Sequence, residues 1–261
     1  MTSEAPREQT LIEHLVELRS RLLKAAAALL LTTLAVMPFA SQMYTVPAAP
    51  LMAQLPVGAT MIATGVAAPF MAPFKLAMIV GLLLSAPVVL YQVWAFVAPG
   101  LYRHERALAV PLLVSSVLLF YAGAAFAYFL VFPMVFQFFL SAAPEGVSVM
   151  TDINSYLDFV LKMFLGFGAG FEVPVATTLL VLTGMVTPQQ LRQARPYVIV
   201  VAFIVGMVLT PPDVISQIML AVPMCLLYEV GVWCAAPLAA RSRRLREQAG
   251  LSAADGPPPS G

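Results

Sequence analysis

Charge is scarce in this sequence. Only 10% of the 261 residues are Asp, Glu, Lys or Arg, whereas 61% are hydrophobic and the mean hydropathy is +0.89. A soluble domain of this size needs polar surface to cover its core, so the composition excludes one and indicates a polytopic membrane protein. The net charge of +1 gives no indication of nucleic-acid binding, and no nucleic acid is expected as a partner.

Histidine and cysteine are also rare, and their positions fit none of the common catalytic or metal sites. The sequence contains two histidines, His14 and His104, and two cysteines, Cys225 and Cys234. It lacks the HExxH, GxSxG and P-loop patterns, and no cluster of His, Cys and carboxylates suggests a metal site. The cysteines lie in one apolar run at a spacing that places them on opposite faces of a helix. We therefore expect no enzyme, no metal, no cofactor and no disulfide between these cysteines.

Apolar residues gather into six runs, which predict six transmembrane helices and an all-α membrane fold. An amphipathic segment at 1–21 precedes them, the transmembrane domain covers 22–238, and a disordered tail is expected at 239–261. The fifth run provides about 21 Å of helix against a hydrocarbon core of about 30 Å, and both it and the sixth run are expected to be short. The predicted spans are 22–40, 74–97, 107–132, 156–183, 197–210 and 214–234.

Lys and Arg are distributed unevenly between the two sides of these spans. Of the 14 Lys and Arg residues, all except Lys75 and Lys162 lie before or at the start of the first span, after the second, after the fourth or after the last. The predicted loops at 44–73 and 133–155 contain none. The positive-inside rule therefore predicts that both termini are cytoplasmic and that these two loops lie outside.

One acid lies in the middle of a predicted span. Glu172 is the only ionisable residue in 164–182, and a charged carboxylate at the bilayer centre costs at least about 2.5–3.5 kcal/mol on insertion scales. Small residues precede it and Pro174 follows it, so this helix is expected to make a close contact or to bend. Glu172 is then either a functional group that faces a cavity or a partner helix, or a protonated acid that is hydrogen-bonded inside the bundle.

Two other acids lie where the chain is predicted to meet the cytoplasmic face of the membrane. Glu17 precedes the first span and Glu105 precedes the third. A partly desolvated carboxylate at such a position can receive a guanidinium through two hydrogen bonds. From spacing alone, the acids can equally pair with arginines of their own segments, namely Arg19, Arg21, Arg103 and Arg106.

Six motifs resemble TatC, the multispanning subunit of the twin-arginine protein translocase. They occur in order and at family-like spacing, and the resemblance covers about 9–239. The motifs are HLVELRSR at 14–21, SAPVVLYQVWAFVAP at 85–99, LYRHER at 101–106, FEVP at 171–174, RPY at 195–197 and LTPPD at 209–213.

The resemblance implies a fold, a location and a function. TatC-like proteins have six transmembrane helices in a cupped, glove-like arrangement, with short fifth and sixth helices, in the bacterial cytoplasmic (inner) membrane. They are not enzymes, and they bind the twin-arginine signal peptides of folded proteins. They assemble in membrane lipid with single-span TatB-like and TatA-like proteins, in what is expected to be an oligomeric complex. The proton-motive force drives the transport.

The resemblance also implies roles for residues near the cytoplasmic face. Glu17 and Glu105 match the acids that receive the two arginines of the signal peptide. Arg19 belongs to the same signature as Glu17, whereas Phe96 and His104 lie near Glu105 in the sequence. These three residues are expected in or beside the recognition surface.

Further roles follow for residues in the spans and outer loops. Glu172 matches an intramembrane acid that faces the cup. Thr210 and Gln217 match a polar cluster that binds a partner helix, although hydrogen bonding between helices of this chain is the simpler interpretation. Pro50 and Asp213 match outer-loop positions that matter for function, and a rigid turn is the role expected of Pro50.

An alternative function is a proton-coupled transporter of small molecules, with Glu172 as the proton carrier. The sequence offers little support for it, because it shows no internal repeat and only one acid deep in a span. An intramembrane enzyme would need a nucleophile with its base, or two aspartates, at depth. The only deep acids are Glu172 and Glu229, and Glu229 lies close enough to the end of the sixth span to reach the interface.

Overall fold

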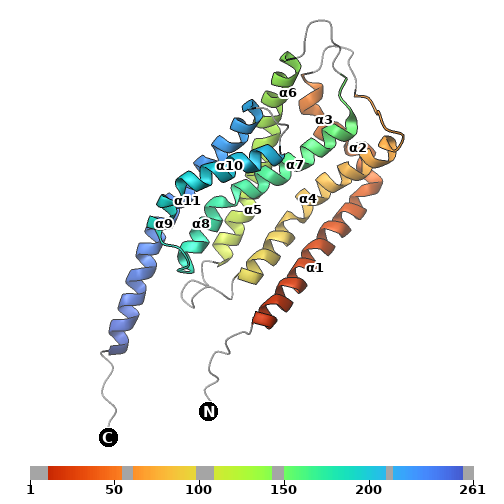
Figure 1. Ribbon diagram of the computed structural model, residues 1–261. Helices are drawn as coiled ribbons and strands as arrows, with labels where there is room; N and C mark the ends of the chain where they lie inside the picture. The colour runs from red at the N-terminus through yellow and green to blue at the C-terminus, as the bar shows by residue number, and fades with distance from the viewer. Residues whose placement is uncertain (1–10, 55–60, 98–108, 143–149, 210–213, 255–261) are drawn as a thin grey trace. The chain divides into compact units, whose positions relative to one another are not determined.

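The computed structural model describes residues 11–54, 61–97, 109–142, 150–209 and 214–254 (Figure 1). Over these residues the regular structure is helical, with one isolated β-bridge between Ile62 and Asp152. The all-α fold class predicted from the sequence is confirmed. The chain divides into two compact units, one formed by 1–100 with 145–161 and the other by 101–144 with 162–261.

The first unit is built on two long helices, α1 and α4. The described part of the predicted amphipathic segment and most of the first span form one continuous helix, α1, because no Pro or Gly interrupts the Leu- and Ala-rich sequence between them. The helices of this unit are α1 (Leu11–Val36), the 3₁₀ turn η1 (Met37–Phe39), α2 (Ala40–Met43), α3 (Thr45–Met52), α4 (Ala68–Val97) and the first part of α7 (Ile153–Phe171).

Helices α1 and α4 run antiparallel (Figure 1). They approach each other closely at Gly81. The Thr32 hydroxyl donates a hydrogen bond of 3.1 Å to the Gly81 carbonyl oxygen. A Cβ atom at Gly81 would lie 3.0 Å from the Cα atom of Thr33, so a larger residue would push the two backbones apart. Small residues at a contact of this kind allow membrane helices to pack without a hydrophobic driving force.

The second unit contains the remaining helices. Its core is partly aromatic: the rings of Phe132 and Phe164 lie 5.4 Å apart, and those of Phe126 and Phe167 lie 5.5 Å apart. The elements are α5 (Ala109–Phe126), a π-helical turn η4 (Ala127–Val131), α6 (Phe132–Ser141), the rest of α7, α8 (Val173–Leu182), α9 (Pro188–Gln193), α10 (Arg195–Leu209) and α11 (Val214–Ala254).

The third predicted span is longer than the sequence suggested. We expected Pro133 to begin an outer loop, but the helix continues as α6 to Ser141, so the loop assignment is wrong for 133–141. Pro133 stands in the first turn of α6, directly after the π-helical turn, where the hydrogen-bond register has already changed. A missing N–H is tolerated at such a position.

The last two helices differ from each other in length. Helix α10 has 15 residues, whereas the apolar part of α11, Gln217–Pro237, has 21. The prediction of a short fifth helix is therefore confirmed, and that of a short sixth helix is wrong. The predicted disorder after 239 is also wrong as far as Ala254, because this stretch consists largely of Ala, Arg, Leu, Glu and Gln, which favour helices.

Five helical stretches in the described residues are long and apolar enough to cross a membrane, and α10 is a shorter apolar helix. Together with α10, these five stretches correspond in order to the six predicted spans. The number of crossings and the side on which the termini lie stay predictions. The five stretches are Glu13–Phe39, Ala68–Val97, Val110–Ser141, Ile153–Leu182 and Gln217–Pro237.

Candidate functional site

Glu17 lies near the N-terminal end of α1, on the side that faces the C-terminal end of α4. Its carboxylate oxygen Oε1 accepts a hydrogen bond of 3.2 Å from Nη2 of Arg21, one helical turn further along. The second terminal nitrogen of Arg21, Nη1, donates a bond of 3.3 Å to the side-chain oxygen of Gln92 on α4. The Glu17 side chain is 25% exposed, so the carboxylate is partly desolvated and still reachable from solvent.

Phe96 lies at the same end of the α1–α4 pair. Its ring stacks on that of His14, with ring centroids 4.4 Å apart and an interplanar angle of 26°. Since His14, Glu17 and Arg21 recur at intervals of three and four residues, all three lie on one face of α1. We use the term α1–α4 polar site for this group, which consists of His14, Glu17, Arg21, Gln92 and Phe96.

The structure brings only some of the predicted recognition residues together. Glu17 and Phe96 both belong to the α1–α4 polar site, and their role in recognition stays a prediction. Arg19 is exposed and lies about 200° around α1 from Glu17, so it faces another direction. Glu105 and His104 lie outside the described residues, so the pairing of two carboxylates stays a prediction.

Glu172 lies at the break between α7 and α8. Helix α7 ends at Phe171 and α8 begins at Val173, with Pro174 in its first turn. Because proline has no N–H, it cannot continue the hydrogen-bond ladder of α7, which accounts for the interruption. The sequence led us to expect a close contact or a bend here, and the structure shows an interruption of the helix at this position.

The glycines before Glu172 are sites of close approach, as predicted. A Cβ atom at Gly168 would lie 2.5 Å from the ring of Phe120, and one at Gly166 would lie 2.3 Å from a methyl group of Leu209. Only glycine fits these contacts without a movement of the neighbouring side chains. The helix that carries Glu172 is therefore packed closely on both α5 and α10.

The Glu172 carboxyl group is only partly satisfied. Its Oε1 atom is buried and has no hydrogen-bond partner in the described part of the chain. The group also has a side-chain hydrogen bond with Ser116 of α5, a residue that is fully buried. A buried polar atom without a partner is costly, by about 1–3 kcal/mol, and in native proteins it calls for a specific explanation.

Gln217 connects the last two helices. Its side-chain nitrogen donates a hydrogen bond of 2.8 Å to the carbonyl oxygen of Phe203, and its Cγ atom would lie 3.1 Å from a Cβ atom added at Gly206. This is the interhelical hydrogen bond that the simpler interpretation expected. Thr210 and Asp213 lie outside the described residues, so the rest of the predicted polar cluster stays a prediction.

Pro50 is buried within the helix α3, so the rigid turn expected of it from the sequence is wrong. The Tyr156 hydroxyl of α7 donates a hydrogen bond to the carbonyl oxygen of Pro47 in the same helix. Lys75 of α4 forms an ion pair of 2.8 Å with Asp158 of α7. These contacts tie α3, α4 and the start of α7 together, and they favour a structural role for Pro50.

Asp152 is a connecting residue that we did not single out in the sequence. Its Oδ1 atom accepts hydrogen bonds from the backbone N–H and the hydroxyl of Thr64, at 3.1 and 2.9 Å. Its Oδ2 atom accepts from the N–H and the hydroxyl of Ser155, at 3.0 and 3.1 Å, and so caps the start of α7. The backbone N–H groups of Thr64 and Ser155 lower the pKa of Asp152 from 3.8 to about 2. An acid just before an apolar helical run is the signal that would have revealed this cap.

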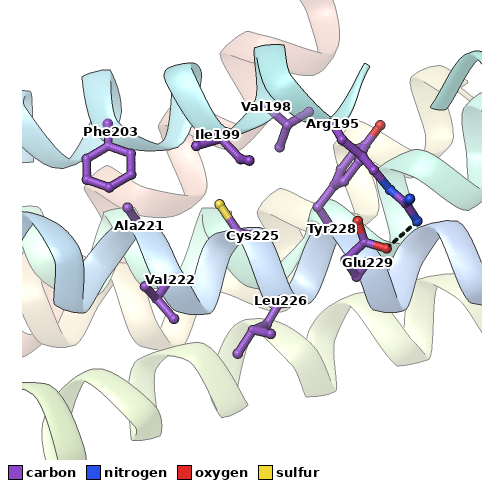
Figure 2. Close-up of a pocket in the computed structure, with 10 residues that line it drawn as sticks. All are labelled: Arg195, Val198, Ile199, Phe203, Ala221, Val222, Cys225, Leu226, Tyr228 and Glu229. Atoms are coloured by element: carbon purple, nitrogen blue, oxygen red, sulfur yellow. Dashed lines mark hydrogen bonds and ion pairs between the residues drawn. The ribbon is translucent and has the colours of Figure 1, made fainter. Parts of the chain in front are cut away.

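Glu229 forms an ion pair with Arg195, the first residue of α10, at 2.7 Å. Figure 2 shows this pair at one end of an apolar groove between α10 and α11. The groove has a volume of about 380 Å³, and the Tyr228 hydroxyl nearby donates a bond of 2.7 Å to the Leu191 carbonyl oxygen. Both charged side chains are more than one-third exposed, which is consistent with the expectation that Glu229 reaches an interface.

No group of His, Cys, Asp and Glu with the geometry of a metal site occurs among the described residues. The α1–α4 polar site offers one carboxylate and one aromatic surface for a cationic ligand, whereas Glu172 offers a hydrogen-bond acceptor within a span. Neither contains a nucleophile with a base in contact. The chemistry that these sites support is binding.

Comparisons with known proteins agree with this chemistry. The family described as Sec-independent protein translocase protein (TatC) matches residues 13–223. The TatC protein of Azotobacter chroococcum is 58% identical over 97% of both chains, and that of Escherichia coli strain K12 is 60% identical over 86% of this chain and 87% of its own. A crystal structure described as the twin arginine translocase receptor TatC has a TM-score of 0.78 and 37% identity, and it covers 87% of this chain and all of its own.

Proposed function

The chain belongs to the TatC family, and on that basis we propose that it binds the twin-arginine signal peptides of folded proteins for export. As a TatC protein it is a non-enzymatic subunit of a Sec-independent protein translocase and a multipass inner-membrane protein. The comparisons do not favour the alternative of a proton-coupled transporter of small molecules. The finer proposal concerns the ligand, its binding residues and the partner subunits.

The observation that carries the proposal is the hydrogen bond between Glu17 and a guanidinium group. The carboxylate is held at the end of two packed helices, is partly desolvated, and accepts from Nη2 of Arg21. It therefore already has the surroundings that an arginine ligand requires. Under the proposal Glu105 supplies the second carboxylate, and the motif that contains it, LYRHER, supports that assignment.

Recognition by carboxylates explains why the ligand would contain arginine rather than lysine. The planar guanidinium can donate two parallel hydrogen bonds to one carboxylate, whereas an ammonium group acts as a single point charge. Replacing either arginine with lysine keeps the charge and removes the second bond. The stacked rings of His14 and Phe96 offer a flat surface beside Glu17 on which a guanidinium can also lie.

We also propose that the protein works with single-span partner subunits, of the TatB and TatA type, in an oligomeric complex driven by the proton-motive force. The polar groups along the spans support this, because a helix that carries a donor would satisfy the open Oε1 atom of Glu172. The distribution of Lys and Arg supports an orientation with both termini in the cytoplasm. The signal peptide would then meet Glu17 on the cytoplasmic side.

Crosslinking tests the recognition step. A twin-arginine signal peptide with a photoreactive group is added to membranes that contain the wild-type chain, Glu17→Ala, Glu105→Ala or the double variant. We expect the double variant to lose specific crosslinking while it still inserts into the membrane. Each single variant should bind more weakly by about tenfold or more, because hydrogen bonds to charged groups contribute about 1.5–3 kcal/mol each.

Glu13→Ala is the matched control, since it removes an exposed acid one turn before Glu17 on the same helix. We expect it to crosslink nearly as well as the wild type. Unchanged crosslinking of the double variant would show that these carboxylates do not bind the signal peptide. A similar loss in Glu13→Ala would show that net charge, rather than the Glu17 position, determines binding.

A further inference from the structure

The Glu17 carboxylate is occupied by an arginine of its own chain. Nη2 of Arg21 donates to Oε1 of Glu17 at 3.2 Å, and Nη1 donates to Gln92 of α4 at 3.3 Å. The guanidinium is thus shared between two acceptors on two helices. It makes one rather long bond to each, and it does not form the paired, parallel bonds of about 2.7–2.9 Å that a guanidinium can make to one carboxylate.

We propose that Arg21 is an internal substitute for the signal-peptide arginine and lowers the affinity of the Glu17 position for its ligand. This inference rests on the proposed function. In the free protein Arg21 keeps the carboxylate oriented. A signal-peptide arginine must then displace Arg21 from Glu17, which it does by forming two bonds where Arg21 forms one.

Competition of this kind lowers the affinity for every cationic ligand of Glu17 by the same factor, because each ligand must displace the same Arg21. An incoming guanidinium gains a second hydrogen bond to Glu17, whereas an incoming ammonium offers no such fork. That fork therefore sets the ratio between the arginine and lysine affinities, and Arg21 sets how tightly either ligand binds.

Gln92 gives the displaced arginine an alternative partner. Because Nη1 of Arg21 already bonds to the Gln92 side-chain oxygen, the guanidinium can leave Glu17 and stay hydrogen-bonded to α4. The Arg21 side chain is 27% exposed, so water can also reach the group during the exchange. A partly exposed ion pair one turn apart on a helix is weak enough to be exchanged, with a contribution to an equilibrium of up to about fivefold.

The test uses the purified full-length chain in nanodiscs and a fluorescent signal peptide with either two arginines or a lysine in place of one of them. We expect Arg21→Gln to bind the twin-arginine peptide about two- to fivefold more tightly than the wild type, because the competitor is gone. The lysine-containing peptide should gain by the same factor, because both peptides displace the same group. The ratio between the two affinities should therefore stay constant.

Lys24→Gln is the matched control, because it removes one positive charge from the same helix. Lys24 is exposed and forms no ion pair within the described residues. Any gain that Lys24→Gln shows measures the general effect of lower positive charge on a basic peptide. Arg21→Lys, which keeps the charge and the aliphatic stem, provides a second variant if Arg21→Gln fails to fold, and it should show a smaller change in the same direction.

Two outcomes would overturn the proposal. Weaker binding in Arg21→Gln or Arg21→Lys would show that Arg21 supports the site rather than competing for it. A gain no larger than that of Lys24→Gln would show that only charge matters. A further readout is the double variant Arg21→Gln with Glu17→Gln, which should bind no better than Glu17→Gln alone.

The same measurements separate this proposal from the one on which it rests. If Glu17→Gln leaves the affinity of the wild type unchanged, the recognition role of Glu17 fails. If binding depends on Glu17 but Arg21 behaves in one of the two contradicting ways, only the role of Arg21 fails.

Discussion

The two acids Glu17 and Glu172 differ in their hydrogen-bond partners. At the α1–α4 polar site the Glu17 carboxylate accepts a hydrogen bond from Arg21 of its own helix. At the α7–α8 break the Oε1 atom of Glu172 is buried and has no partner in the described part of the chain. The first acid lies at the end of a helix pair and can exchange its partner with solvent nearby. The second lies within an apolar helical stretch and shares a side-chain hydrogen bond with Ser116.

The difference indicates two kinds of binding event. At Glu17 a ligand has to replace an existing interaction, so the outcome depends on how much better the new bond is. At Glu172 a ligand adds an interaction that is absent, so any suitable donor gives a gain. The first arrangement sets a threshold that a peptide must pass to bind, and the second favours docking of a helix that carries a polar group.

Substitutions of Glu172 should have the largest effect. We expect Glu172→Gln to retain most transport activity, because the amide keeps a polar group for the bond with Ser116 and can also interact with a partner. Glu172→Ala and Glu172→Lys should impair transport, since loss of a buried polar contact costs about 1–3 kcal/mol, or about 5- to 150-fold in an equilibrium. Export of a twin-arginine reporter protein in cells measures the effect.

A control for these variants is the amount of chain in the membrane, which should be similar for all three. If Glu172→Gln were as inactive as Glu172→Lys, the simple docking role would be wrong. Transport would then require an acid that titrates at this position.

Gly81→Ala should disturb the α1–α4 polar site, although Gly81 is not one of its residues. The new Cβ atom would lie 2.5 Å from the Thr33 hydroxyl oxygen and 3.0 Å from two Thr33 backbone atoms, so the helices must separate. We expect the free energy of unfolding to fall by about 1–3 kcal/mol, the usual effect of overpacking. Peptide binding at Glu17 should weaken too, because Gln92 and Phe96 would move away from α1.

Gly65→Ala is the matched control, since nothing lies within 4 Å of a Cβ atom at that position. Thermal unfolding, followed through the fluorescence of Trp94 on α4, compares the two variants. An equal melting temperature for Gly81→Ala and Gly65→Ala would show that the close approach of α1 and α4 contributes nothing to stability.

Acid should have the smallest effect, confined to the contact between Asp152, Thr64 and Ser155. The pKa of Asp152 in the folded chain, about 2, is below its ordinary value of 3.8. The ionised form therefore stabilises the fold at pH values above 3.8, and this contribution is lost as the pH falls towards 2. The amide chemical shifts of Thr64 and Ser155, followed by NMR from neutral to acid pH, should titrate with a midpoint near the lower value.

Asp152→Asn provides the comparison for this titration, because its amide cannot ionise and the shifts should then stay constant over the same range. A midpoint near 3.8 in the wild-type chain would show that the backbone N–H groups do not hold the carboxylate. The result would also weaken the view that Asp152 links the β-bridge at Ile62 to the start of α7.

Local features of this chain were the ones that the sequence predicted well. Pro174 predicted the helix interruption beside Glu172, and the short apolar run before Pro211 predicted the short helix α10. The helix ends predicted at Pro133 and after 239 were wrong for a common reason. A proline or a charged stretch does not end a helix where the local hydrogen-bond register, or the helix propensity of the residues, allows the helix to continue.

By itself, the sequence determined the helical membrane fold, the family and the position of an acid within a span, because these depend on composition and on residues close together in the chain. The tertiary structure decided that Arg21 lies between Glu17 and Gln92, that Asp152 binds Thr64, and that Arg195 pairs with Glu229. Apart from the one-turn bond between Arg21 and Glu17, the partners in these contacts are 34 to 88 positions apart. Which side chains meet over such separations depends on how the helices pack, and the packing is set by contacts such as that of Gly81 with Thr33.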